Sequence, residues 1–133
     1  MSPFLAELKL NELDEKDMEW LVVGCKVMPS GAEPYHIMMD LAHGKVRCFR
    51  LGEHTGILVI KVLQHPAFRE LFIFLLAGEG VFDILEEAFP ELEQLAKDYQ
   101  CSKIGCWARK GLEKVLGERL DFKAERTYCV KEV

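Results

Sequence analysis

The sequence has no hydrophobic run long enough to cross a membrane, and its longest apolar stretches are short segments such as Leu71 to Ala77. A spanning helix needs about 20 apolar residues. The first residues also lack the basic stretch, apolar segment and small cleavage site of a secretory signal. We therefore expect a protein that has no membrane partner and lies in the cytoplasm.

The sequence also lacks closely spaced pairs of cysteines. The chain has five cysteines, an odd number, and no two of them form a CxxC motif. Without an export signal this pattern favours free, mostly buried thiols over disulfides. Cys101 and Cys106 lack the second closely spaced pair that structural zinc sites usually show, so we expect no metal site.

Positive charge is scarce. The 17 Lys and Arg residues are outnumbered by 22 Asp and Glu residues, which gives a formal net charge of −5. Nucleic-acid binding needs a surface that neutralises phosphates, so we expect no nucleic-acid partner. The motifs GxSxG, HExxH and GxxxxGK[ST] are absent as well, so nothing indicates a serine hydrolase, a zinc protease or a P-loop enzyme.

What remains fits one globular domain spanning residues 1–133. The chain is 133 residues long and 50% hydrophobic, and no linker or repeat divides it. A chain of this size buries roughly two-thirds of the surface that its unfolded form exposes, so it needs no metal or disulfide to form a core.

Hydrophobic periodicity predicts strands and helices in the order β-α-α-β-β-β-α-β-α-β. The predicted strands are 3–10, 46–51, 57–63, 70–76, 103–108 and 122–130, and the predicted helices are 14–28, 33–43, 81–99 and 110–116. Glycines bound the 52–56 loop, which predicts an antiparallel hairpin. We therefore expect an α/β (α+β) fold with a mixed, mostly antiparallel central sheet of six or seven strands flanked by helices.

One glycine turn lies between the most apolar strand and the most regular helix. It consists of Ala77-Gly78-Glu79-Gly80 and is followed by Val81. Free N–H groups at a helix start, beside glycines that let a ligand approach, form a general anion site. The alternative is that the two glycines only permit a tight turn from strand to helix.

The element order and this turn resemble the GNAT superfamily of N-acetyltransferases, over a region from about Leu5 to Val130. In that family the turn has the form Arg/Gln-x-x-Gly-x-Gly/Ala and binds the pyrophosphate of acetyl-CoA. The resemblance implies acetyl-CoA as co-substrate and an N–H near Leu76 or Ala77 for the thioester carbonyl. It assigns cofactor contacts to Leu76, Ala77, Gly78, Gly80 and Val81.

Several positions depart from the family pattern. Ala77 stands where the family has Arg or Gln, Phe82 replaces its small residue, and Glu79 puts a carboxylate where phosphates would approach. The segment Trp107 to Leu116 followed by Phe122 resembles the family's last strand–helix–strand stretch, in which Leu112 takes the place of the tyrosine acid. The cofactor and catalytic motifs are therefore degenerate.

The catalytic candidates are Glu70 and His65. Family members often place a glutamate on this strand to remove a proton from the acceptor amine, which leads us to Glu70. His65 precedes Pro66 at a predicted strand end, where site residues are common, and a histidine titrates near neutral pH. The implied acceptor is an amine of a small molecule or of a protein.

A further resemblance is to short GNAT-like proteins of bacteriophages and prophages. It rests on Leu76 to Gly80, Phe89-Pro90, Gln100-Cys101 and Trp107 to Leu112. Two functions therefore stay open: an acyl-CoA-dependent N-acyltransferase, or a non-catalytic virion or accessory protein that binds a virion or host protein. The second function implies the host cytoplasm or the virion as its location, and nothing in the sequence indicates an oligomeric state.

Overall fold

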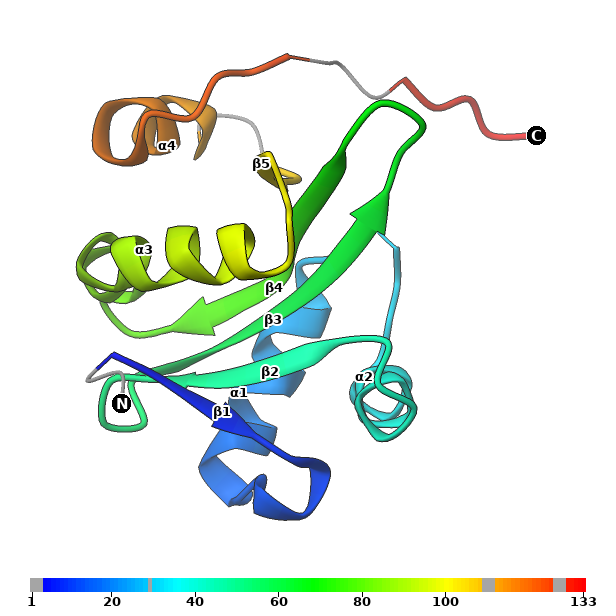
Figure 1. Cartoon of the computed structure of the whole chain (residues 1–133). Coiled ribbons are helices and arrows are strands. Elements are labelled where there is room, and N and C mark those ends of the chain that lie inside the picture. The colour runs from blue at the N-terminus through cyan, green and yellow to red at the C-terminus, as the bar shows by residue number, and fades with distance from the viewer. Residues whose placement is uncertain (1–3, 29, 109–111, 126–128) are drawn as a thin grey trace.

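The computed structural model describes residues 4–28, 30–108, 112–125 and 129–133. Their path through the fold is drawn in Figure 1. The elements are β1 (Leu5–Leu8), the short 3-10 helix η1 (Leu10–Glu12), α1 (Glu15–Lys26), α2 (Pro34–Ala42), β2 (Arg47–Leu51), β3 (Gly56–Gln64), β4 (Arg69–Gly78), α3 (Val81–Asp98), β5 (Lys103–Cys106) and α4 (Leu112–Leu120).

One five-stranded sheet organises the fold, with the strand order β1-β2-β3-β4-β5. The first three neighbouring pairs are antiparallel, and β4 and β5 are parallel. Parallel neighbours need a crossover, and α3 supplies it. The mixed, mostly antiparallel sheet and its flanking helices are thus confirmed, whereas the expected six or seven strands are wrong for the part of the chain that the structure describes.

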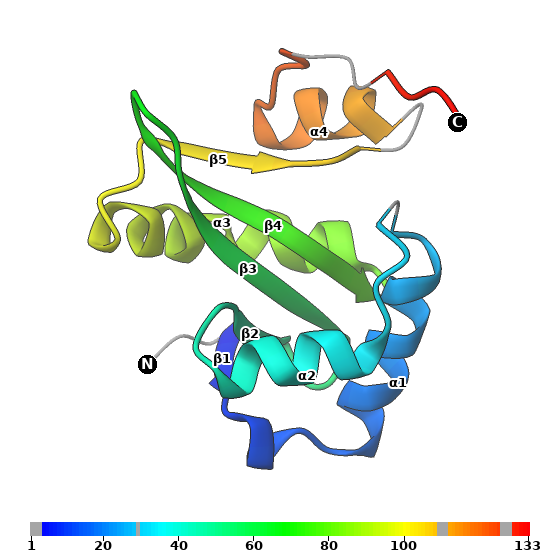
Figure 2. The same cartoon turned by 90° about the vertical axis from the view of Figure 1, so that its right-hand side faces the viewer.

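Helices cover both faces of the sheet (Figures 1 and 2). On one face α3 contributes Leu85, Ala88 and Leu92 to a core that includes Leu58 and Leu71 of the strands. On the other face α1 and α2 pack over a second core. Its buried members are Leu8, Leu21, Cys25, Ile37, Val46, Cys48, Ile57, Val59, Leu75 and Ala77. The β3 and β4 strands therefore lie inside the sheet, as their continuous apolar character predicts.

Local sequence signals explain where the first two helices begin. Asp14 caps α1: its carboxylate accepts the N–H of Asp17, whose own carboxylate accepts the N–H of Asp14. Pro34 begins α2, where its missing N–H costs nothing. Gly44 follows α2 with a φ of 72°, a conformation that glycine adopts without strain.

The C-terminal region departs from the expectation. The predicted strand 122–130 is wrong, because residues 121–125 and 129–133 form no strand, and residues 126–128 lie outside the described part. Instead the ring of Phe122 packs edge-on against Phe89 of α3 at 5.8 Å, and its N–H donates to the Leu116 carbonyl. Gly117 does not end the helix as predicted, since α4 continues to Leu120.

Two further expectations concern the whole chain. Among the described residues, none of the helices combines the length and apolar character needed to cross a membrane. All five cysteines are free, as predicted, but only Cys25 and Cys48 are buried, so the expectation that most of the thiols are buried is wrong.

Candidate active site

The candidate site begins where β4 and β5 part. Their parallel pairing runs only from Glu70 opposite Lys103 to Ile73 opposite Cys106. Beyond Ile73, no described strand pairs with this side of β4. β5 therefore occupies this edge of β4 up to Ile73, and among the described residues the edge is unpaired only after Ile73.

A β-bulge lies at the same level. Val59 of β3 pairs with Leu75, and the next residue, Ile60, pairs with Ile73, so Phe74 is the extra residue. Phe74 has a partner in the ladder of neither neighbouring strand. A bulge of this kind leaves its extra residue unpaired and bends the strand. The opening beside β4 and the irregularity within β4 thus coincide.

The glycine turn leads from this opening into α3. Gly80 is the N-cap of α3 with a φ of 56°, and its carbonyl accepts the N–H groups of Asp83 and Ile84. The N–H groups of Val81 and Phe82 belong to the first turn, so they have no partner within the helix. A Cβ at Gly80 would meet no atom within 4 Å. The start of α3 is accordingly open to a ligand and has free backbone donors, which fits a pyrophosphate group.

The other predicted contact residues are used differently. Ala77 is buried in the core under α1, and Leu76 packs against the core under α3, so only their backbones border the site. Gly78 has a structural reason to be glycine, because a Cβ there would collide with the Thr55 carbonyl oxygen. The Thr55 carbonyl also accepts the N–H of Glu79 at 2.9 Å. The side chain of Glu79 is exposed beside the turn, where its charge would repel phosphates.

The acidic first turn of α3 is partly neutralised by α4. The guanidinium of Arg119 contacts the carboxylates of Asp83 and Glu86, each at 2.5 Å. The hydrogen bond to Asp83 is the main reason why the pKa of Arg119 is raised above its ordinary value. Arg119 thereby fixes α4 to the helix that begins at the glycine turn.

The two catalytic candidates lie together near the start of β4. The His65 Nε2 and Glu70 Oε1 atoms are 2.8 Å apart, and both side chains are partly buried. The His65 ring stacks on Phe68 at 4.5 Å, which fixes its orientation. The second carboxylate oxygen of Glu70, Oε2, lies against Gly105 of β5, at a place that a Cβ would occupy. Glu70 is therefore held by one hydrogen bond and by a neighbour without a side chain.

The structure thus divides the predicted site residues between two ends of β4. Glu70 and His65 lie at its N-terminal part and the glycine turn at its C-terminal end, with the bulge at Phe74 between them. Cys106 is near Glu70, and burial, with a smaller contribution from Glu70, raises the pKa of its thiol. A thiol that keeps its proton cannot accept another, so Cys106 is not a candidate base.

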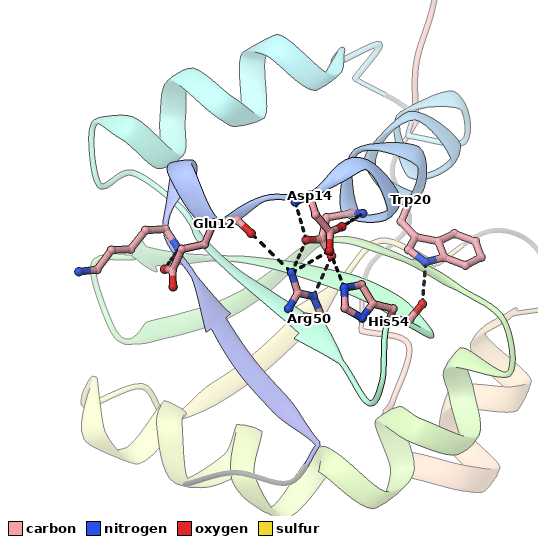
Figure 3. Close-up of polar contacts among 7 residues, drawn as sticks. Glu12, Asp14, Trp20, Arg50 and His54 are labelled. Atoms are coloured by element: carbon pink, nitrogen blue, oxygen red, sulfur yellow. Dashed lines mark hydrogen bonds and ion pairs between the residues drawn. The ribbon is translucent and has the colours of Figure 1, made fainter.

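A polar network connects the start of α1 with β2 and with the loop that precedes β3 (Figure 3). Asp17 is fully buried, and its carboxylate accepts two hydrogen bonds from Arg50, at 2.6 and 3.1 Å. The second carboxylate, Asp14, contacts Arg50 at 3.4 Å and His54 at 2.5 Å. The His54 carbonyl accepts the indole N–H of Trp20 at 3.2 Å. This network fixes the 52–55 loop, and Thr55 in turn supports the glycine turn.

The network also has the spacing of a metal site. Asp14, Asp17 and His54 each offer one ligand atom, and these atoms lie within 4.8 Å of one another. However, the guanidinium of Arg50 already contacts both carboxylates. Since Arg50 supplies the positive charge that would balance them, we assign the cluster to folding.

Comparison with solved structures finds the same fold in several acetyltransferases. A ribosomal-protein-alanine N-acetyltransferase from Brucella melitensis has a TM-score of 0.71 at 15% identity, over 97% of this chain and 98% of that one. An aminoglycoside acetyltransferase from an uncultured soil sample has a TM-score of 0.69 at 17% identity, over 100% and 99%. A Trypanosoma brucei acetyltransferase has a TM-score of 0.68 at 12% identity, over 97% and 98%. The chain therefore has the fold of these acetyltransferases, the GNAT-like fold that the resemblance implies.

Sequence comparison adds nothing to this. No family model matches the chain, and no curated protein matches it. At identities this low the likeness concerns the fold, so the function has to be argued from the site.

Sequence reasoning missed the bulge at Phe74, the contact of Glu70 with Gly105, and the network around Asp17. The first two depend on strand register, which no local pattern reveals. The third left a partial signal, because Asp14 and Asp17 have the spacing of a capping box before a helix.

Proposed function

We propose that the protein is an N-acyltransferase that uses an acyl-CoA donor, acetyl-CoA in the simplest case, and an amine acceptor. The observation that carries the proposal is the unpaired edge of β4 beyond Ile73, which leads directly to the open N-terminus of α3. An extended ligand could pair with the strand edge at one end and place a phosphate at the helix start at the other.

The donor site follows from these two features. The amide groups of the pantetheine arm would pair with the backbone of 74–78, and the first turn of α3 would hold the pyrophosphate through the N–H groups of Val81 and Phe82. Gly80 leaves room for this approach. Ala77 and Glu79 contribute no positive charge, so we expect weaker binding than a turn with an arginine would give.

The reaction needs little from the side chains. The amine nitrogen forms a bond to the thioester carbonyl carbon, the carbon–sulfur bond breaks, and the thiolate of CoA leaves. Glu70, oriented by His65, accepts the proton from the amine directly or through water. An N–H group in the unpaired stretch that begins at Phe74 stabilises the carbonyl oxygen as it gains charge.

Titration calorimetry with acetyl-CoA tests the donor site, and the release of free CoA in the presence of pentylamine tests the transfer. We expect saturable binding of acetyl-CoA, a higher melting temperature with it, and amine-dependent release of CoA. Glu70→Gln should keep acetyl-CoA binding and lose at least 100-fold in transfer rate, as expected for the loss of a general base. If acetyl-CoA at millimolar concentration neither binds nor shifts the melting temperature, the proposal is wrong.

The second candidate function is a non-catalytic protein of phage or prophage origin that binds a virion or host protein. Exposed apolar side chains on α1, at its C-cap and on α2 favour it. They are Val22, Val23, Val27, Tyr35 and Met39, which are 42 to 55% exposed. Failure of the acetyl-CoA titration would leave this candidate as the better one.

A further inference from the structure

Lys61 of β3 has no role in the proposed reaction as described so far. It is the one charged residue in the apolar segment 57–63 of β3, and it pairs directly with Phe72 of β4. Ile60, which precedes Lys61 on β3, and Leu71, which precedes Phe72 on β4, belong to the core under α3. Because side chains alternate along a strand, Lys61 and Phe72 point to the opposite face of the sheet.

The same alternation places Glu70 on this face, two residues before Phe72 on β4. Phe74 also packs on this side, since the bulge turns it toward the core under α1. One face of the sheet therefore carries a carboxylate, two aromatic rings and an ammonium group. Phe72, Phe74 and Lys61 lie near the level where β4 and β5 part, and Glu70 lies where the pairing of these two strands begins.

The charge of Lys61 is unbalanced. Its ammonium lies 3.9 Å from the centroid of the Phe74 ring, and no ion pair of Lys61 exists within the described part of the chain. The side chain is half-buried rather than extended into solvent. A half-buried ammonium is stabilised further by an anion, and the ring alone supplies only a weak attraction.

We propose that this face of the sheet binds the acceptor, and that Lys61 selects amines that also carry a carboxylate at a distance from the amine. The inference rests on the proposed function, because Glu70 receives the proton of the reacting amine. The carboxylate of such an acceptor contacts Lys61, its methylene groups lie over Phe72 and Phe74, and its amine reaches Glu70. Lys61 takes no part in bond making, so it sets specificity rather than rate for a neutral acceptor.

The test compares 5-aminopentanoate with pentylamine, which has the same amine and nearly the same length but no carboxylate. We expect kcat/KM for acetyl transfer to be roughly tenfold higher for 5-aminopentanoate, the size of one charge-assisted contact at a partly exposed site. In Lys61→Met the two acceptors should become equal, mainly because KM for 5-aminopentanoate rises. Lys61→Arg keeps the charge and should keep part of the preference.

A matched control uses Lys97, an exposed lysine of α3 on the other face of the sheet. Lys97→Met should keep the preference unchanged, and the melting temperature of each variant checks that it folds. Equal kcat/KM for the two acceptors in the unchanged protein would overturn the inference while leaving the transferase function intact. A preference that survives Lys61→Met would overturn it too. Absence of acetyl-CoA binding would instead refute the proposed function and this inference with it.

Discussion

The Oδ2 atom of Asp17, a fully buried residue, lies 2.6 Å from Nη2 of Arg50. This pair joins the first turn of α1 to β2 on the face of the sheet that α1 covers. Removal of one partner would leave the other charge buried without compensation, which is far more costly than the loss of an exposed ion pair.

We therefore expect Arg50→Met to lower the free energy of unfolding by about 3 kcal/mol. Urea denaturation followed by circular dichroism measures it. The matched control is Arg47→Met on the same strand as Arg50. It removes an exposed ion pair with Glu7 of β1 and should cost less than about 1 kcal/mol. Equal losses in the two variants would show that the buried pair has no special weight.

The pH dependence of stability follows from Asp14. The backbone N–H of Asp17, followed by the hydrogen bond from His54, lowers the pKa of Asp14 from 3.8 to about 2. A carboxyl whose pKa is lower in the folded state contributes stability above its ordinary pKa, and this contribution disappears as pH falls from about 4 to 2. Asp14→Asn keeps a capping oxygen and should flatten the loss of stability over that range, as measured by urea midpoints at successive pH values. An unchanged slope in the variant would contradict the assignment.

A substitution in the glycine turn can show whether the turn binds the donor or has only a structural role. Glu79→Lys replaces a repulsive charge with an attractive one, so binding of acetyl-CoA should tighten about tenfold, roughly 1.4 kcal/mol. A cation at the helix start should slightly lower the melting temperature. Calorimetric titration and a thermal melt measure the two effects. If only the melting temperature changes, the turn has no ligand role.

Gly80→Val supplies the complementary experiment. The φ of 56° at Gly80 is unfavourable for a β-branched residue, so we expect a loss of about 1 to 2 kcal/mol in unfolding free energy. The added side chain would also fill the space through which phosphates approach, and acetyl-CoA binding should become undetectable in variant protein that still folds. Retained binding would place the pyrophosphate elsewhere.

Gly105 tests how Glu70 is held. A methyl group at this position would take the place of Oε2, so Gly105→Ala should displace the Glu70 carboxylate and lower kcat/KM for acetyl transfer by at least tenfold. Stability should change little, because the displaced atom is the end of a flexible side chain. The double variant with Glu70→Gln should be no less active than Glu70→Gln alone. A further loss in the double variant would show that Gly105 acts independently of Glu70.

The sequence allowed most of the fold to be predicted and less of the site. Local signals were sufficient to place α1, α2 and the glycine-bounded hairpin, because each such signal acts within a few residues. The 122–130 strand failed because alternation around Phe122 cannot show whether a neighbouring strand is available. Phe122 packs on Phe89 instead. The partners of Glu70 and Lys61 depend on the register of distant strands, which pattern alone does not determine.

The strand order has a consequence for how the protein folds. Since β1 to β5 follow one another in the sheet as they do in the chain, each strand from β2 on is added beside one that precedes it in the sequence. The last addition differs from the others, because β5 must return past α3 and gains only four residues of parallel pairing. The four paired residues offset little of the entropy lost when such a long loop closes. The pairing of β4 with β5 should therefore be the least stable part of the sheet. The amide hydrogens of β5 should exchange with solvent before those of β3.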